Sequence, residues 1–395
     1  MTVLAAARVV TGEQVHSPGW VAYEADRITG VGHGRPGHVD RDLGDAVVVP
    51  GFVDVHVHGG GGGAFTGDVA SALQAVETHR RHGTTTTMAS LVTADAGELL
   101  TSVSMLAELY EAGVIAGIHL EGPWISPSRC GAHDPTQLRH PDRVEMGRLL
   151  EAGRGAVRMV TLAPELPGGY DAIRQVVDAG AVAAVGHTDA SYEEVVQAIS
   201  AGARVATHLF NGMRPIHHRR PGPILALLED PQVSLELIVD GSHLHPALFR
   251  RTSEAVGPDR VLLVTDAMAA AAMRDGSYQL GALGVTVSGG VAHVTDTDTI
   301  AGSTATTDQL FRAAVEAVLS SSDPDHTPEV DTYNEALLRA ALQTSTNPAR
   351  TFSWTDIGSL QPGLRADLVL LDTQLHVIDV VRCGVSCADT APSCT

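Results

Sequence analysis

VVVPGFVDVHVH, residues 47–58, is the stretch of sequence that decides the fold. The β-branched and apolar residues before the histidines predict a strand that is buried on both faces. Because side chains alternate along a strand, His56 and His58 face the same side, about 6–7 Å apart along the chain. Two imidazoles that converge at a strand end form half of a metal site. The alternative is a pair of partly exposed histidines at the strand end, and the rest of the chain decides between the two.

Seven further apolar runs follow this stretch, and segments with helical spacing separate them. Eight alternations of strand and helix predict a (β/α)8 barrel, which belongs to the α/β class. The seven runs are Thr84–Val92, Val114–Leu120, Ala156–Leu162, Ala181–Val185, Ala203–Thr207, Val233–Val239 and Val261–Thr265.

The two ends of the chain have a different pattern. Residues 1–50 alternate polar and apolar side chains between turn signals, and strand character returns in residues 356–385. We therefore predict a small β-sandwich built from both chain ends, beside a metal-dependent hydrolase barrel over residues 51–355. A hairpin insertion is expected at Val285–Val294, and a disordered tail at residues 386–395.

Composition excludes several functions. The formal net charge of −20 argues against nucleic acid and anionic membranes as partners. No apolar run approaches the roughly 18 residues of a membrane span, and four cysteines make no disulfide framework, so we expect a cytoplasmic protein. All 26 basic residues are arginine, which excludes Schiff-base catalysis, a P-loop lysine and a carbamylated-lysine metal bridge.

Metal-ligating and carboxylate side chains gather at the ends of the predicted barrel strands. Barrel enzymes carry their chemistry on this face, so we predict a metal-centred hydrolase site. The residues at the strand ends are His56 and His58, His119 and Glu121, His187 and Asp189, His208 and Asn211, Asp240 and His243, and Asp266.

The order of these residues resembles the amidohydrolase superfamily. Five motifs resemble in particular the branch of it that deacetylates N-acetylglucosamine 6-phosphate: PGFVD at 50–54, HLEGPW at 119–124, GHT at 186–188, THLFNGM at 207–213 and VTDA at 264–267. The resemblance covers nearly the whole chain. It implies release of acetate and glucosamine 6-phosphate in amino-sugar catabolism and cell-wall recycling.

The resemblance also implies the metal ligands. One tight site for a divalent cation would hold zinc, iron, manganese or cobalt, and we expect a second, weaker site because both histidines of the HxH pair are present. The tight site would use Glu121, His187 and His208, and the weaker one His56, His58 and Asp266, with Glu121 spanning the two.

Catalytic roles follow from the same resemblance. Asp266 would be the general base that takes a proton from water and returns it to the departing amine. His133 would help to polarise the acetamide carbonyl. Cys130 precedes His133 by three residues, and we expect its oxidation or alkylation to hinder that loop.

The phosphate requires positive charge in this acidic chain, and residues 217–220, HHRR, form its densest basic cluster. In the resembled branch the residue that matches Arg219 binds phosphate from the neighbouring subunit, which implies a homodimer with shared active sites. Further substrate contacts are expected from Ala132, His133, Asn211, Gly212, Asp240, His243 and a closing loop of Ile300, Ala301 and Gly302.

Two other readings compete with this one. A related amidohydrolase acting on a cyclic amide or an aminopurine would share the metal ligands, but His133, Arg219 and His243 favour a phosphorylated sugar. A catalytically silent barrel that serves as an assembly protein would not need the full ligand set.

Overall fold

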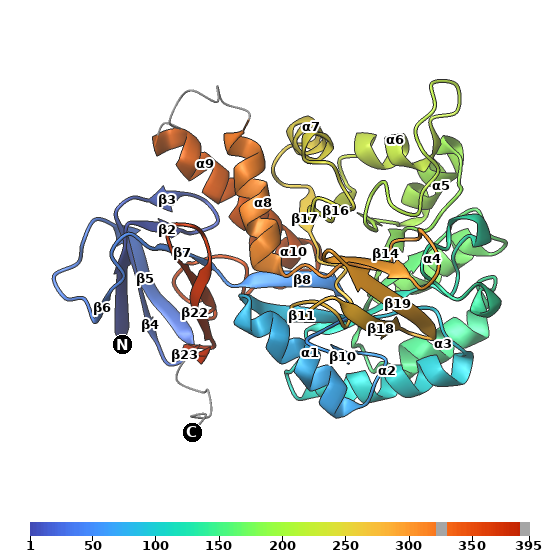
Figure 1. Ribbon diagram of the computed structural model, residues 1–395, viewed down its shortest axis with the longest axis horizontal. Helices are drawn as coiled ribbons and strands as arrows, with labels where there is room; N and C mark the ends of the chain where they lie inside the picture. Colours follow the sequence, from blue (N-terminus) through green and yellow to red (C-terminus); the bar gives the residue numbers. More distant parts are fainter. Residues whose placement is uncertain (321–329, 388–395) are drawn as a thin grey trace.

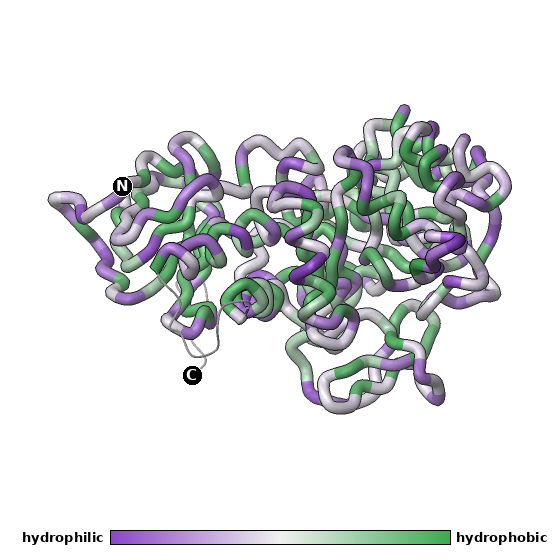
Figure 2. The backbone as a smooth tube through the Cα atoms, turned by 90° about the horizontal axis from the view of Figure 1, so that it is seen from above, coloured by the Kyte–Doolittle hydropathy of each residue, from purple (hydrophilic) through white to green (hydrophobic). Residues whose placement is uncertain are grey.

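The computed structural model describes residues 1–320 and 330–387. Figure 1 shows a barrel with its surrounding helices beside a smaller β-structure, and Figure 2 shows the two parts lying side by side along the long axis. The expected tail at 386–395 falls outside the described residues, apart from Ser386, which ends a strand, and Cys387.

Eight parallel strands form the barrel, and each predicted apolar run contributes one of them. Neighbouring strands follow one another in chain order around the sheet. The barrel closes where Val57 pairs with Ala267 and the backbone N–H of His58 donates to the Ala267 carbonyl at 2.8 Å. The strands are β8 (Phe52–Val57), β11 (Thr84–Leu91), β12 (Gly117–Glu121), β13 (Val157–Leu162), β14 (Val182–Val185), β15 (Val205–Ala206), β16 (Ser234–Leu237) and β17 (Val261–Leu263).

The first apolar run is divided between the two parts of the molecule. Val47–Pro50 forms β7 in the small β-structure, and β8 starts at Phe52 in the barrel. Gly51 lies between them, where any Cβ would collide with the side chain of Thr85. A run that its composition predicts as one strand is therefore divided at this glycine, where the Thr85 side chain leaves no room for a Cβ.

Helices cover the outside of the barrel and pack apolar faces against it. Asp68, Asp95, Asp142 and Ser191 each accept a backbone N–H at a helix start, which fixes where those helices begin. The helices are α1 (Val69–Arg81), α2 (Ala96–Glu111), α3 (Arg143–Ala152), α4 (Gly169–Asp178), α5 (Tyr192–Ala201), α6 (Gly222–Glu229), α7 (Pro246–Val256), α8 (Thr307–Leu319), α9 (Val330–Ala341) and α10 (Asn347–Thr351).

Two sheets form the β-sandwich, and both ends of the chain contribute strands. One has the order β23 (Val385–Ser386), β22 (Val377–Arg382), β21 (Leu368–Leu371), β7, β2 (Arg8–Val10) and β3 (Val15–His16). The other has the order β5 (Arg27–His33), β4 (Gly19–Glu24), β1 (Thr2–Ala6) and β6 (Arg41–Asp42). Leu4, Val21, Val48 and Leu370 belong to one buried cluster between them, so the expected sandwich is present.

The expected hairpin at Val285–Val294 is also present, with one more strand than predicted. β18 (Gly276–Leu280), β19 (Leu283–Ser288) and β20 (Val291–Val294) form an antiparallel sheet, and Val285 packs in a cluster with Met268 beside the barrel mouth. A two-residue pair, β9 (Gly59–Gly60) and β10 (Gly63–Ala64), follows β8. Among the described residues, no helix is both long and apolar enough to cross a bilayer.

Candidate metal centre

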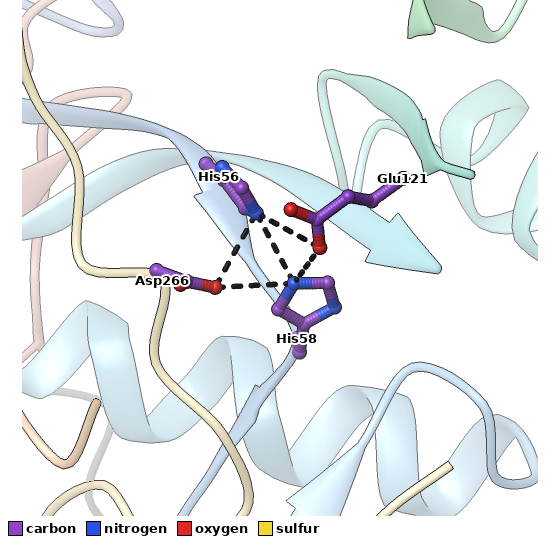
Figure 3. Close-up of side chains that lie close together, drawn as sticks. All are labelled: His56, His58, Glu121 and Asp266. Atoms are coloured by element: carbon purple, nitrogen blue, oxygen red, sulfur yellow. Dashed lines mark hydrogen bonds and ion pairs between the residues drawn. The ribbon is translucent and has the colours of Figure 1, made fainter. Parts of the chain in front are cut away.

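Glu121, the last residue of β12, lies between two groups of histidines. Its Oε1 is 3.0 Å from Nε2 of His187 and 3.0 Å from Nε2 of His208. Its Oε2 is 3.1 Å from Nε2 of His58 and 3.5 Å from Nε2 of His56 (Figure 3). Each oxygen of this buried carboxylate therefore faces a different group of histidines.

The cluster at His56 and His58 also contains Asp266. Oδ1 of Asp266 is 3.3 Å from Nε2 of His56 and 3.2 Å from Nε2 of His58, and the two ring nitrogens are 3.1 Å apart (Figure 3). With bond lengths of about 2.0–2.1 Å to a divalent cation, two donors on one ion lie about 3.0–3.4 Å apart. The four side chains therefore fit a divalent cation by donor type and by spacing.

The second cluster is held from outside by the backbone. Nε2 of His187 lies 3.0 Å from Nε2 of His208, the spacing found in the first cluster. Nδ1 of His187 is 2.8 Å from the carbonyl oxygen of Arg129, and a carbonyl can only accept, so the ring proton is on Nδ1. The lone pair of Nε2 is then free for a cation beside Glu121, which is the usual arrangement of a ligating histidine.

Three residues of the clusters have left-handed backbone. The φ angles are 47° for His187, 29° for His208 and 47° for Asp266. Non-glycine residues rarely adopt such angles, and they do so mainly at functional sites that the surrounding structure holds in place. These turns direct the three side chains toward Glu121.

His133 reaches the centre from the loop between β12 and α3. The backbone N–H of Thr93 points at its Nδ1 over 3.3 Å, so Nδ1 accepts and the proton of the neutral ring is on Nε2. That Nε2 lies 3.5 Å from Oε2 of Glu121. Burial lowers the pKa of His133 to about 4, so the ring is neutral at pH 7 and presents an N–H to the centre.

Charges in the centre favour a carboxylate at Asp266. Burial alone would raise the pKa of Asp266, but His56 and His58 beside it hold that pKa below its usual range. Burial opposes the charged form of His243 too, yet its 2.8 Å contact with Asp240 raises the pKa of the His243 ring. The hydrogen bond from His243 also lowers the pKa of Asp240 against the effect of burial, so Asp266 and Asp240 are both carboxylates, which accept protons or hydrogen bonds.

Other expected substrate contacts lie close to these turns. Asn211 donates to the backbone carbonyl of His208 at 3.2 Å. Gly212 has a φ of 59°, and a Cβ there would lie 2.9 Å from Nδ1 of His187. Gly302 has a φ of 60°, and a Cβ there would lie 2.8 Å from the Asp266 carbonyl. Only glycine allows these two close approaches.

The remaining expected contacts are in three loops. Ala132 adjoins His133 and packs against the cluster beneath β18–β20. Ile300 pairs with His293, and Ala301 donates to the Ala292 carbonyl, so this segment continues the insertion sheet. Arg219 is exposed in the β15–α6 connection, with its guanidinium 2.7 Å from the His218 ring.

Cys130 lies in the same loop as His133. Burial raises the pKa of the Cys130 thiol, which disfavours the reactive thiolate.

Sequence reasoning missed two buried acids beneath the centre. Glu236 of β16 is fully buried, with Oε2 3.0 Å from Nδ1 of His56. Asp54 of β8 is also fully buried; it accepts from Thr265, and burial raises its pKa to about 6. A single acid inside each apolar run, Leu235-Glu236-Leu237 and Val53-Asp54-Val55, was the available signal, because an acid is rarely buried without a purpose.

A parallel barrel whose strand ends bring histidines and carboxylates together defines the class of metal-dependent hydrolases. The model of the amidohydrolase family matches residues 47–391. The chain therefore belongs to the amidohydrolase family, and within it to the N-acetylglucosamine-6-phosphate deacetylase branch, as the following relatives indicate.

A solved variant of N-acetyl-D-glucosamine-6-phosphate deacetylase from Mycobacterium smegmatis, in complex with N-acetyl-D-glucosamine-6-phosphate, is 51% identical with a TM-score of 0.93 and covers 98% of each chain. N-acetylglucosamine-6-phosphate deacetylase of Bacillus subtilis is 34% identical over 94% of this chain and 93% of its own. N-acetylgalactosamine-6-phosphate deacetylase of Escherichia coli O157:H7 is 35% identical over 84% and 85%, respectively.

Proposed function

We propose that this hydrolase cleaves the acetamide of N-acetyl-D-glucosamine 6-phosphate to give D-glucosamine 6-phosphate and acetate. The observation that carries the proposal is the position of Glu121, each oxygen of which faces one pair of histidines, while Asp266 adjoins the pair His56 and His58. The 51% identity to a deacetylase solved with this substrate supports the choice of amide.

Glu121, His187 and His208 would hold the tighter cation. His56, His58 and Asp266, with the second oxygen of Glu121, would hold the weaker one. A divalent cation supplies two things here: it lowers the pKa of a bound water to about 7 and it polarises the acetamide carbonyl. Zinc, iron, manganese and cobalt all accept imidazole and carboxylate ligands.

Two side chains would move or hold protons. Asp266 takes a proton from the attacking water and later returns it to the sugar nitrogen as the C–N bond breaks. Nε2–H of His133 donates to the carbonyl oxygen as negative charge develops on it. The amide and water are thereby converted to acetate and the amine.

The substrate would be held by its phosphate and its ring. Arg219 from a second copy of the chain, His243 and the backbone of Asn211 and Gly212 would bind the phosphate, since an arginine fork can bind two oxygens at once. Ala132, Asp240 and the loop Ile300–Gly302 would contact the sugar. A homodimer in the cytoplasm, serving amino-sugar catabolism and cell-wall recycling, stays a prediction of the sequence.

The Escherichia coli relative supports a second candidate substrate, N-acetylgalactosamine 6-phosphate. The same acid and base would serve this epimer, so only the contacts to the ring hydroxyls would differ. Action on a cyclic amide or an aminopurine would leave His243 and Arg219 without a purpose.

Acetate release tests the proposal, with both epimers and a cyclic amide as substrates. We expect release from N-acetylglucosamine 6-phosphate that stops on chelation and returns with added cation. Asp266→Asn should lower kcat about 10²–10⁴-fold, the usual contribution of a general acid–base group. Asp296→Asn, in an exposed turn of the insertion, is the matched control. No release from the cation-loaded protein, or full release by the Asp266 variant, would contradict the proposal.

A further inference from the structure

Glu236 is a buried acid that the proposed reaction does not use. It belongs to β16, its side chain is fully buried, and it points inward beneath the metal centre while Leu235 and Leu237 pack in the core outside the barrel. Leaving a carboxylate in such a place is costly unless its oxygens are paired. Its contacts therefore indicate what it does.

One oxygen of Glu236 contacts both clusters. Oε2 lies 3.0 Å from Nδ1 of His56 and 3.2 Å from the backbone nitrogen of His208. The backbone carbonyl of Glu236 also accepts the N–H of Leu209 at 2.8 Å. The acid thus holds the left-handed turn at His208 and, at the same time, the ring of His56.

The bond to His56 decides which nitrogen of that ring can bind a cation. Because a carboxylate oxygen accepts, the ring proton is on Nδ1 and the lone pair of Nε2 points at Glu121 and Asp266. The opposite tautomer would point an N–H into the cluster and exclude a cation. A carboxylate behind a ligating histidine also makes its ring a stronger donor.

The second oxygen of Glu236 shows that packing alone does not explain the residue. Oε1 is buried and has no hydrogen-bond partner among the described residues. Leucine would avoid burying a polar oxygen here, and leucine already occupies both neighbouring positions on the strand. The strand therefore keeps an acid at this position although one of its oxygens has no partner among the described residues.

We propose that Glu236 is a positioning residue that orients His56 and thereby sets whether the His56–His58–Asp266 cluster holds its cation. The inference rests on the two-cation form of the proposed function. Glu236 does not contact substrate and acts on the His56–His58–Asp266 cluster through His56. Through the turn at His208 it also aligns the cluster of His187 and His208 with that cluster.

Metal content and affinity test this inference. Glu236→Gln keeps an oxygen that can accept both hydrogen bonds but removes the charge, and Glu236→Leu removes both. We expect the wild type to bind two cations per chain. Glu236→Gln should bind the cation at His56 and His58 about 10–100-fold more weakly, because the loss of such an outer partner usually lowers metal affinity by that factor. Glu236→Leu should bind one cation. Equilibrium dialysis against zinc with elemental analysis gives both quantities.

Asp379→Asn is the matched control, because Asp379 is a buried acid of the sandwich that pairs with Arg41 at 3.0 Å, away from the centre. It should keep two cations. In a His56→Gln background, Glu236→Gln should change kcat/KM no further, whereas a purely structural role would lower it again.

Unchanged zinc content and affinity in both Glu236 variants would overturn the inference, as would an equal loss in Asp379→Asn. A wild type that binds one zinc per chain would also overturn it, while acetate release by that protein would still uphold the deacetylase function. The two proposals therefore fail separately.

Discussion

The backbone N–H of Thr93 donates to Nδ1 of His133 over 3.3 Å, which leaves the ring proton on Nε2, the nitrogen that faces Glu121. Thr93 follows β11 and His133 follows β12, so two neighbouring barrel strands cooperate to aim one N–H bond. The Thr93 hydroxyl lies 2.9 Å from the same Nδ1 and can donate to it as well, so Thr93 holds the His133 ring as a donor with both its backbone and its side chain.

His133→Gln should lower kcat about 10²–10³-fold and leave KM within a few-fold, because the loss of one donor to a developing oxyanion costs that much. Steady-state acetate release measures both constants. His140→Gln, an exposed residue of the same connection, should behave as the wild type. A change in KM with kcat intact would assign His133 to ground-state binding instead.

The double variant His56→Gln/His58→Asn should bind one cation per chain where the wild type binds two. Its amides have an oxygen and a weakly ligating nitrogen in place of two imidazole donors. Elemental analysis after dialysis gives the count, and the cation retained should be the one at Glu121, His187 and His208. Two cations in the variant would show that the HxH pair is not a ligand pair.

Arg219→Ala should raise KM about 10–100-fold with a smaller effect on kcat, since a hydrogen bond to a charged group is worth about 1.5–3 kcal/mol. If Arg219 serves the neighbouring active site, mixed dimers with Asp266→Asn recover activity. In such a dimer the subunit with intact Asp266 receives an intact Arg219 from its partner. Mixing the two variants and measuring acetate release at low substrate tests this, and no recovery would contradict a shared site.

Asp308, at the start of α8, should make the free energy of unfolding of the protein depend on pH. Burial opposes its charge, but His82, Thr306 and Arg312 lower the pKa of Asp308 to about 2, below its usual 3.8. A folded pKa below the unfolded one stabilises the protein above pH 3.8, and that stability is lost as pH falls toward 2. The advantage of wild type over Asp308→Asn in the free energy of unfolding should be about 2 kcal/mol at pH 6 and shrink below pH 4.

Urea unfolding of metal-free protein at pH 6, 4 and 3 measures this difference. Asp171→Asn is the control, because Asp171 forms an exposed pair with Arg174. Its effect should be small and should not vary with pH in this way. A constant difference between wild type and Asp308→Asn from pH 6 to pH 3 would show that the carboxylate is not preferentially stabilised.

The barrel could be predicted from the sequence because its signals are local. Apolar runs such as Val157–Leu162 alternate with amphipathic segments, and strand ends share one face of a barrel, so His56, Glu121 and His208 could be expected to meet. These signals depend only on residues that are close together in the chain, so they are visible without any knowledge of contacts between distant segments.

What could not be predicted depends on contacts between distant segments. The break between β7 and β8 falls at Gly51, against the side chain of Thr85, whereas the sequence alone predicts an unbroken strand there. The inward direction of Glu236 depends on the register of β16 against β15 and β17, which period-two alternation does not fix in a run buried on both faces. The left-handed angle at His208 is imposed by the same distant strand.

The position of β7 in the sandwich sheet has a consequence for biosynthesis. β7 continues directly into the strand that carries His56, and it lies between β2 and β21, whose residues Leu368–Leu371 follow the whole barrel in the chain. While the ribosome is still translating the chain, β7 has only one of its two neighbours. We therefore expect the HxH strand to become rigid only after Leu371 has been made, so that loading of the cation waits until the whole barrel has been translated.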